Sequence, residues 1–341
     1  MPAMSSDSKP RILVAEKLSP AAMAKLHAAG DVVVLEACDE ATLLSVVAAA
    51  DALAVRTYSQ VTAKVIGEAN RGGRLKVIGR AGVGVDNIDV KAAAEAGIPV
   101  VHTPAACTHA VAELTVGLII AVQRQIPFFD ARVRQGEFAA LRSAGKLMPE
   151  LRHQTLGVIG MGRIGQAVSR RLHNGMGMRV IYRDIREIGY LPFVATPMPS
   201  HEAVYAEADV VTMHVPLTRL TRGMINARTL AHFKSGSVLI NTSRGAVVEA
   251  DALAAALGEG RLSGVAVDVF DPEPPPPGHP LLRAPNCVLT PHVGSRSKEG
   301  LAAMNDVVDD IVAVLAGKPP QYLADPELCL RQIVTPPGLA R

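Results

Sequence analysis

Three polar residues in the second half of the chain have side chains that suit hydride-transfer chemistry on a hydroxy acid. Arg244 lies in the segment NTSRG, Glu273 in VDVFDPEP and His292 in LTPHVGS, each after an apolar run. A histidine can remove the hydroxyl proton as hydride leaves carbon, and a nearby carboxylate orients and stabilises the protonated imidazole. A guanidinium can bind an α-keto carboxylate and polarise the carbonyl. We predict these three as the catalytic residues.

Each of these residues also has a structural alternative. Arg244 can cap loop carbonyls, and Glu273 can be a solvated residue of a proline-rich loop. The chain has ten histidines, and a single histidine after a strand is more often structural than catalytic. The combination favours catalysis, because ligands bind outside the carboxyl ends of parallel strands, where all three segments are expected.

A glycine pattern in TLGVIGMGRIG indicates a dinucleotide site. Gly160, Gly162 and Gly165 have GxGxxG spacing directly after a strand-like run and at the start of a helical pattern. The first glycine allows a tight turn, and the second lets the backbone approach a pyrophosphate. The third permits close helix packing, with the phosphates at the helix N-terminus.

The choice between NAD and NADP depends on the segment RVIYRD. Asp184 stands at its end and can accept hydrogen bonds from the adenosine ribose hydroxyls, which favours NAD. Arg183 and Arg186 flank it, and guanidinium groups there can bind a 2′-phosphate. We predict NAD, with NADP as the open alternative.

Apolar runs alternate with alanine-rich amphipathic stretches, which is typical of strands and crossover helices in parallel sheets. Two series of strands are expected. The first covers 11–16, 31–37, 52–57, 75–80 and 100–103; the second covers 155–160, 179–183, 209–215, 237–241, 264–269 and 287–290. Long helices are expected at 110–136 and 298–316. We predict an α/β fold with two doubly wound parallel-sheet domains.

The two series imply a discontinuous arrangement, with a Rossmann NAD-binding domain inserted into a flavodoxin-like substrate domain. The substrate domain is expected to begin in residues 1–105, and the NAD-binding domain to occupy 106–297. Residues 298–341 would form a C-terminal helix and tail that return to the substrate domain. A length of 341 residues suits about two domains.

Composition excludes several classes of protein. With 49% hydrophobic and 20% charged residues, the chain can bury large cores. The net charge of +3 without basic runs argues against nucleic acid. No signal-like N-terminus occurs, and the longest apolar run, 114–122, is far shorter than the ~20 residues of a membrane span. We expect a cytoplasmic protein with no membrane segment.

Cysteine and histidine spacing gives no metal site. The four cysteines are far apart and lack a CxxC pattern, which fits a reducing compartment: Cys38, Cys107, Cys287 and Cys329. His102, Cys107 and His109 are close in sequence, but their spacing matches no zinc-ligand pattern. We predict that the protein holds no metal. His214 in HVPLT is expected to be structural or part of a cofactor loop.

Together, the motifs resemble the D-isomer-specific 2-hydroxyacid dehydrogenase family from about residue 11 to residue 317. The matching segments, in the family's order, are GRAGVGVDNIDV, VAELTVGLIIA, TLGVIGMGRIG, HVPLTRLTRGMI, LINTSRGAVV, VAVDVFDPEP and LTPHVGS. The resemblance implies an NAD-dependent homodimeric enzyme that interconverts a D-2-hydroxy acid and its 2-keto acid. It implies the same catalytic residues, Arg244, Glu273 and His292.

The resemblance also implies binding residues. Cofactor contacts beyond the glycines are implied at Arg163, Ile164, Asp184, Val215, Pro216, Thr221, Thr242, Ser243, Asp268 and Gly294. Among these, Asp268 would hold the nicotinamide carboxamide. The backbone N–H groups of Val83 and Gly84 would meet the substrate carboxylate, and domain closure would complete the site.

Within the family, the first domain resembles the phosphoglycerate dehydrogenases through AVRTYSQVT, VIGRAGVGVDNID and RQIP. Arg56 and Arg80 match positions near the substrate phosphate in those enzymes, and two guanidinium groups suit a dianion. A surface ion pair for Arg56 and a structural hydrogen bond for Arg80 are equally open. Residues 102–108 read HTPAACT where those enzymes usually read NTPxxNT or NTPxxNS, so both asparagines are lost.

The leading substrate is therefore 3-phosphoglycerate, which would place the enzyme in serine biosynthesis. Glyoxylate, hydroxypyruvate or another small 2-keto acid is the alternative, since the altered loop falls between the expected domains. We expect no C-terminal regulatory domain of the kind that longer family members carry. A rival of another class is an NAD-sensing, corepressor-like binding protein of similar fold. A formate-type dehydrogenase fits less well, because Glu273 stands where that branch has an amide.

Overall fold

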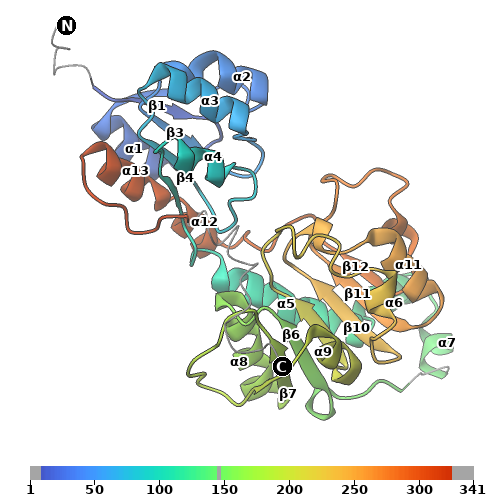
Figure 1. Cartoon of the computed structure of the whole chain (residues 1–341). Coiled ribbons are helices and arrows are strands. Elements are labelled where there is room, and N and C mark those ends of the chain that lie inside the picture. Colours follow the sequence, from blue (N-terminus) through green and yellow to red (C-terminus); the bar gives the residue numbers. More distant parts are fainter. Residues whose placement is uncertain (1–8, 144–146, 325–341) are drawn as a thin grey trace, which may run out of the picture. The chain divides into compact units, whose positions relative to one another are not determined.

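The computed structural model describes residues 9–143 and 147–324. These residues divide into two compact units, which are described separately (Figure 1). Unit 1 contains the described residues up to Cys107 and those from Ser297 onward, and unit 2 contains Thr108–Arg296. The sequence places the boundaries after residues 105 and 297. Cys329 and most of the expected C-terminal tail lie outside the described residues.

Unit 1 contains a five-stranded parallel sheet in the order β2-β1-β3-β4-β5. Its strands are β1 (Arg11–Val14), β2 (Asp31–Val34), β3 (Ala52–Val55), β4 (Val77–Arg80) and β5 (Val100–His102). All five predicted strands are confirmed, and the order is that of flavodoxin-like doubly wound sheets. Strands β3 and β4 are buried along their whole length, because helices cover both faces.

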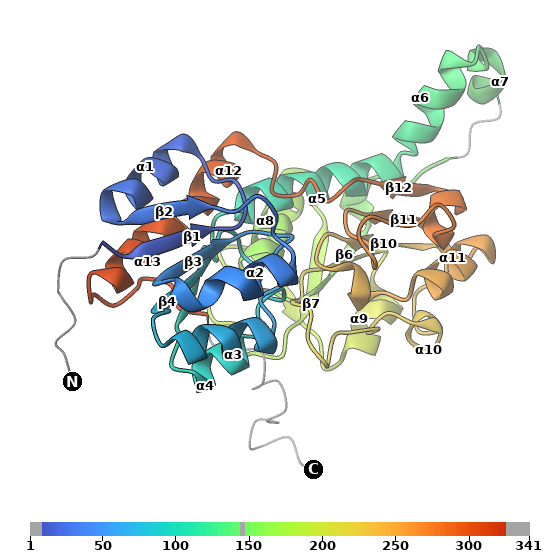
Figure 2. The same ribbon diagram turned by 90° about the horizontal axis from the view of Figure 1, so that it is seen from above.

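Two groups of helices cover this sheet (Figures 1 and 2). They are α1 (Pro20–Ala29), α2 (Glu40–Val46), α3 (Ala63–Gly72), α4 (Val90–Glu95), α12 (Lys298–Met304) and α13 (Val307–Leu315), with a short 3₁₀ turn at Val47–Ala49. Side chains of α2, α3 and α4 form one core with Leu13, Leu53 and Ile78. Helix α13 packs on the other face, where a Cβ at Gly79 would lie 2.4 Å from the Ile311 side chain.

The helix predicted over 298–316 is two helices, α12 and α13. The break falls at Asn305, whose side chain accepts the N–H of Ser19 at 2.8 Å and donates to the Leu301 carbonyl. Such side-chain bonds to backbone compete with the helical ladder. After α13, the Asp310 carboxylate accepts the N–H groups of Gln321 and Tyr322, and the chain bridges antiparallel to β5.

Unit 2 contains a seven-stranded parallel sheet in the order β12-β11-β10-β9-β6-β7-β8. Its strands are β6 (Thr155–Ile159), β7 (Arg179–Arg183), β8 (Thr196–Pro197), β9 (Val210–Met213), β10 (Ser237–Asn241), β11 (Leu262–Val267) and β12 (Cys287–Leu289). The six predicted strands are confirmed, although β11 begins two residues earlier than expected. Strand β8 was not predicted, because two residues carry no periodic signal. Its Pro197 is tolerated at the sheet edge.

Helices cover both faces of this sheet: α5 (Thr108–Gln123), α8 (Arg163–Met176), α9 (His201–Glu207), α10 (Ala227–Leu230) and α11 (Ala250–Gly258). Helices α6 (Ile126–Arg134) and α7 (Phe138–Ser143) extend away from the sheet (Figure 2). Short 3₁₀ turns occupy Leu151–His153, Gly245–Val247 and Pro280–Arg283. Helices α5 and α8 share one core with alternate strand residues, whereas α9 to α11 share the other. This is the three-layer arrangement expected of a Rossmann fold.

The helix predicted over 110–136 is also broken, into α5 and α6. Gln125 adopts a left-handed conformation (φ 50°), and Pro127 follows in the first turn of α6. A proline has no N–H for the preceding turn, so a helix cannot continue smoothly through it. No single helix in the described ranges is long and apolar enough to cross a bilayer; α5 and α6 meet that length only as a pair bent by 60°.

Candidate active site

Glu273 and His292 are hydrogen-bonded in unit 2. His292 Nδ1 lies 2.8 Å from Glu273 Oε2, and the other carboxylate oxygen accepts the backbone N–H of Phe270 at 2.8 Å. The side chains are 35% and 34% exposed, so both are reachable from solvent. Because the carboxylate fixes the proton on Nδ1, Nε2 is the ring nitrogen left for proton exchange.

The charge of Glu273 is stabilised by its surroundings. Burial alone would raise its pKa, but hydrogen bonds from His292 and Phe270 and the positive charge of Arg244 outweigh burial and hold that pKa below its ordinary value. Arg244 Nη1 donates to the Ser243 carbonyl at 2.8 Å. The three residues predicted as catalytic therefore lie in one electrostatic environment.

Asp268 holds the loop that carries His292. Its side chain accepts Thr290 Oγ1 at 2.6 Å and the N–H groups of Val293 and Gly294 at 2.9 and 2.8 Å. Its carbonyl accepts the N–H of His292 at 2.8 Å. This structural role of Asp268 was not predicted from the sequence. The only available signal was that neighbouring parallel strands end at the same sheet edge.

The turn that carries Arg244 is braced from within. Asn241 Oδ1 accepts Ser243 N and Oγ at 3.0 and 2.7 Å, and Asn241 Nδ2 donates to the Arg244 carbonyl at 2.9 Å. A Cβ at Gly245 would lie 2.0 Å from the Phe270 carbonyl. Only glycine allows this approach of the loops that carry Arg244 and Glu273. Neither Asn241 nor Gly245 was predicted from the sequence. Thr242 Oγ1 contacts Thr115 Oγ1 of α5 at 3.0 Å.

In the glycine-rich loop after β6, two glycines are required by close backbone contacts, whereas the third has free space beside it. Gly160 has φ +92°, and a Cβ there would lie 2.5 Å from the His214 carbonyl oxygen. A Cβ at Gly165 would lie 2.2 Å from the Gly160 carbonyl oxygen. At Gly162, the first residue before α8, the nearest atom would be Arg186 Nη2 at 3.7 Å. The loop thus leaves the N-terminus of α8 accessible, which fits a dinucleotide pyrophosphate.

Asp184 and Arg186 stand at the edge of this loop. Asp184 Oδ2 accepts the N–H of Met161 at 2.8 Å, and Oδ1 accepts the N–H of Arg186 at 2.9 Å. Arg186 Nε lies 3.4 Å from Asp184 Oδ1, and its side chain is 58% exposed. An acceptor for ribose hydroxyls and a cation for a 2′-phosphate are therefore adjacent.

The remaining predicted cofactor residues lie around the same strand ends. Arg163 and Ile164 begin α8, and Val215 follows β9 beside Gly160. Thr221 closes its own turn, donating to the Pro216 carbonyl at 2.6 Å and accepting the N–H of Thr218 at 2.8 Å. Burial lowers the pKa of His214 to about 3, which keeps this ring neutral.

The predicted substrate residues of unit 1 lie near the carboxyl ends of β3 and β4. Arg56 Nη1 donates to the Lys17 carbonyl at 3.2 Å. Arg80 is 8% exposed, and its Nη1 lies 3.3 Å from the Ala81 carbonyl. The Val83 carbonyl accepts His102 Nδ1 at 2.9 Å. Arg56 is thus partly exposed, whereas Arg80 lies beneath the turn that leads to Val83 and Gly84.

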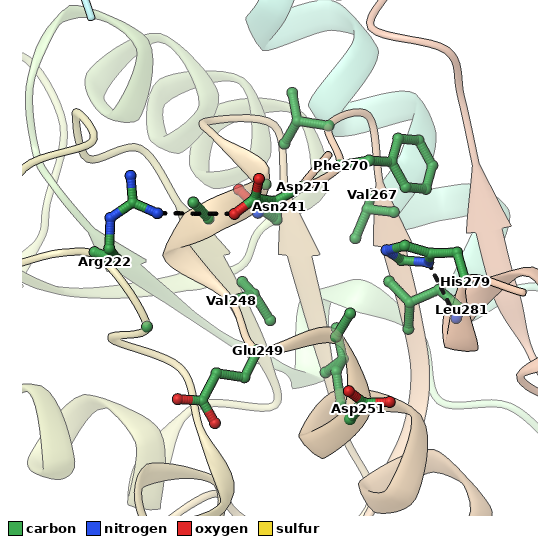
Figure 3. Close-up of a pocket in the computed structure, with 16 residues that line it drawn as sticks. Arg222, Asn241, Val248, Glu249, Asp251, Val267, Phe270, Asp271, His279 and Leu281 are labelled. Atoms are coloured by element: carbon green, nitrogen blue, oxygen red, sulfur yellow. Dashed lines mark hydrogen bonds and ion pairs between the residues drawn. The ribbon is translucent and has the colours of Figure 1, made fainter. Parts of the chain in front are cut away.

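A separate cavity of about 440 Å³ lies in unit 2, beside the turn that carries Arg244 (Figure 3). Arg222 and Asp271 form a 3.8 Å ion pair on one side, and the His279 ring packs edge-on against Phe270 on the other. Its lining includes Gly245, next to Arg244, but no residue of the described 160–165 loop. The cavity is therefore distinct from the glycine-rich cradle.

No group of three or more histidine, cysteine, aspartate or glutamate residues in the described ranges is arranged to hold a metal ion. Of the residues considered for such a site, His102 Nδ1 contacts the Val83 carbonyl and His109 Nδ1 contacts Arg171 Nη2 at 3.2 Å.

Comparison with known proteins shows which family the chain is similar to. The family model for the NAD binding domain of D-isomer specific 2-hydroxyacid dehydrogenases matches residues 116–294. The chain is 41% identical over 320 residues to D-3-phosphoglycerate dehydrogenase of Methanocaldococcus jannaschii, covering 90% of this chain but 58% of that protein. It is 37% identical over 332 residues to glyoxylate reductase of Thermofilum pendens, covering 94% and 96%.

Solved structures match at similar coverage. The structure of NADPH-dependent glyoxylate/hydroxypyruvate reductase from Sinorhizobium meliloti, in complex with NADP and malonate, is 33% identical with a TM-score of 0.83. That match covers 94% of this chain and 98% of the other. The chain therefore spans the full length of some relatives and about half that of others.

Proposed function

Because the chain belongs to the D-isomer-specific 2-hydroxyacid dehydrogenase family, we propose that it interconverts a D-2-hydroxy acid and its 2-keto acid with His292 as acid and base. The observation that carries this proposal is the 2.8 Å hydrogen bond between His292 Nδ1 and Glu273, within the field of Arg244. Arg244, Glu273 and His292 then have distinct roles.

In the oxidative direction, His292 Nε2 removes the proton of the substrate hydroxyl as hydride leaves the carbon that bears this hydroxyl. Glu273 stabilises the imidazolium that forms, because its negative charge is held on the far side of the ring. Arg244 binds the substrate carboxylate or the developing carbonyl. Bound NAD supplies the hydride acceptor, or as NADH the donor. In reduction, the protonated His292 returns its proton to the carbonyl oxygen.

For the cofactor, we propose that the N-terminus of α8 binds the pyrophosphate through Gly162, Arg163 and Ile164. Asp184 would accept the ribose hydroxyls. The nicotinamide end would lie near Asp268, with further contacts from the neighbouring loops at Val215, Pro216, Thr221, Thr242, Ser243 and Gly294. The contacts of Asp268 with the 290–294 loop support a place for it beside the reacting end.

For the substrate, we propose that the backbone N–H groups of Val83 and Gly84 bind the carboxylate, and that 3-phosphoglycerate is the leading acid. A partly exposed Arg56 supports a phosphate contact, as does the likeness to a phosphoglycerate dehydrogenase. The burial of Arg80 favours the second candidate, a small unphosphorylated acid such as glyoxylate or hydroxypyruvate. Likeness to glyoxylate reductases supports the same candidate.

Initial rates followed by NADH absorbance test these proposals. The full chain would be assayed with 3-phosphoglycerate, glycerate, lactate and the matching keto acids, each with NAD and NADP. We expect turnover with NAD and a loss of about 10²- to 10⁴-fold in the His292→Ala variant. Full turnover by that variant would refute the mechanism. Negligible turnover with tight NADH binding would favour a corepressor-like binding protein instead.

We also propose a cytoplasmic homodimer. Helices α6 and α7 extend from the sheet of unit 2 (Figure 2), and they expose Ile126, Phe128 and Phe138 to 50%, 45% and 62%. Exposed apolar side chains grouped in this way are typical of association surfaces. Light scattering measures the molar mass of the full chain and of a Phe128→Asp, Phe138→Asp double variant. We expect a dimer and a monomer, respectively; a variant that stays dimeric would contradict the assignment of this surface.

A further inference from the structure

His102 contacts the turn to which we assign the substrate carboxylate. His102 ends β5, and the turn at Ala81–Val85 follows the neighbouring strand β4. The Nδ1 atom of His102 lies 2.9 Å from the carbonyl oxygen of Val83. A carbonyl oxygen can only accept, so Nδ1 must carry the proton of this hydrogen bond.

A second hydrogen bond reaches the same turn from the adjacent residue. The N–H of Thr103 donates to the Gly82 carbonyl at 3.0 Å. Gly82 has φ +145°, a backbone conformation that residues with a Cβ rarely adopt, and a Cβ there would lie 1.5 Å from Arg80 Nη1. Residues 102 and 103 thus hold two successive carbonyl groups of the turn.

The planarity of the peptide unit gives these contacts a functional meaning. The carbonyl of Val83 and the N–H of Gly84 belong to one trans peptide unit, in which they point in opposite directions. The same holds for the Gly82 carbonyl and the Val83 N–H. Holding each carbonyl at 102–103 therefore aims both N–H groups to the opposite side of the turn.

We propose that His102 is a positioning residue for the substrate, because its Nδ1–H fixes the direction in which the N–H of Gly84 points. This inference rests on the proposed function, in which Val83 and Gly84 bind the substrate carboxylate. Both the neutral Nδ1–H tautomer and the protonated ring keep this donor.

The proposal also explains the departure at position 102 from the phosphoglycerate dehydrogenase pattern, which has Asn there. The amide nitrogen of Asn and the Nδ1 of His are each two bonds from Cβ, so both can donate to the same carbonyl. The amide of Gln is one carbon further out, close to the position of Nε2. Position 102 therefore requires a hydrogen-bond donor on a nitrogen two bonds from Cβ.

Three substitutions in the full chain test this. Compared with wild type, His102→Ala and His102→Gln should raise the keto-acid KM about three- to tenfold, the usual effect of losing one hydrogen bond. The KM for NADH should stay within about twofold, and His102→Asn should restore the keto-acid KM. An Asn variant as impaired as the Gln variant would overturn the proposal, as would an Ala variant that matches wild type.

A readout independent of turnover separates this inference from the proposed function. Amide hydrogen exchange of the peptide that covers residues 81–85 should be faster in His102→Ala and His102→Gln than in wild type, and unchanged in His102→Asn. If wild type reduces no keto acid, the proposed function fails while the exchange pattern still reports on His102. Equal exchange in all four proteins would refute the positioning role. The Asn and Gln pair suffices if the Ala variant does not fold.

Discussion

Asp268 holds His292 through the main chain: the carbonyl of Asp268 accepts the N–H of His292 at 2.8 Å, while its carboxylate accepts the next two N–H groups. The imidazole is therefore aimed by a side chain that does not touch it. Asp268 is only 1% exposed, so each of these hydrogen bonds is costly to lose.

Asp268→Asn should impair catalysis by releasing this loop. An amide has one acceptor oxygen, so at least one N–H of Val293 or Gly294 faces an NH₂ group. We expect unfolding to become easier by about 1–3 kcal/mol and kcat to fall about 10- to 100-fold. Thr290→Val, which removes a single hydroxyl donor, is the matched control and should have a smaller effect. Equal kcat values in Asp268→Asn and wild type would contradict this role.

Glu273→Gln should slow keto-acid reduction. The amide oxygen can still accept the hydrogen bond from His292 Nδ1–H, so the ring keeps its orientation but loses the negative charge beside it. That charge favours the imidazolium in the proton-transfer step, so kcat should fall about tenfold or more. Initial rates with saturating NADH test this. Equal kcat values in Glu273→Gln and wild type would mean that the charge of Glu273 has no part in the proton transfer.

Gly162→Ala and Gly165→Ala should separate cofactor binding from folding. An added Cβ at Gly162 meets only Arg186 Nη2 at 3.7 Å, so the melting temperature should stay close to wild type. The methyl group would stand where the pyrophosphate approaches, so the KM for NAD should rise about tenfold or more. Gly165→Ala would clash with the Gly160 carbonyl and should lower the melting temperature. The reverse pattern would contradict the proposed division of roles.

Arg186→Ala should reduce the use of NADP more than that of NAD. Its guanidinium lies beside Asp184 and is largely exposed, so it can pair with a 2′-phosphate. We expect kcat/KM with NADP to fall about tenfold, with little change for NAD. Arg186→Lys keeps the charge, so its kcat/KM with NADP should lie between those of wild type and Arg186→Ala. Equal losses with both cofactors would place Arg186 at the shared pyrophosphate instead.

Glu16→Gln should destabilise unit 1 in a pH-dependent manner. Glu16 accepts the N–H groups of residues 56–59 and the hydroxyl of Ser59. Burial alone raises its pKa, but these hydrogen bonds lower it below the ordinary value of 4.5. The stabilisation should be full above about pH 4.5 and fade as pH falls further and the wild-type carboxyl protonates.

Thermal melts of Glu16→Gln and wild type at neutral and acidic pH measure this difference. The control is Glu36→Gln, which changes an exposed carboxylate of the same unit. A difference in melting temperature that grows on acidification would contradict the assignment.

The strands were predictable from the sequence, whereas the ends and breaks of helices were not. A buried parallel strand such as β3 appears as an unbroken apolar run of strand length between turn residues. The break at Asn305 depends on a hydrogen bond to Ser19, a residue far away in the chain. Tertiary contacts of this kind leave no periodic signal.

The site followed the same division. Motifs predicted Arg244, Glu273 and His292 because each lies in a short, distinctive segment. Gly245 was not predicted, and Asp268 was predicted only as a cofactor contact. The approach of Gly245 to Phe270 and the hydrogen bonds from the 290–294 loop to Asp268 arise only when β10, β11 and β12 are neighbours, and the sequence does not show which strands are neighbours.

His292 has a left-handed backbone conformation, with φ +51°. A side chain with a Cβ is strained there by roughly 1–3 kcal/mol, and Gly or Asn would adopt the conformation more easily. Selection for stability alone would therefore remove the imidazole from this position. If variants are selected by melting temperature alone, without an assay for turnover, His292→Gly or His292→Asn should therefore be selected. Such variants should have a higher melting temperature and little or no turnover.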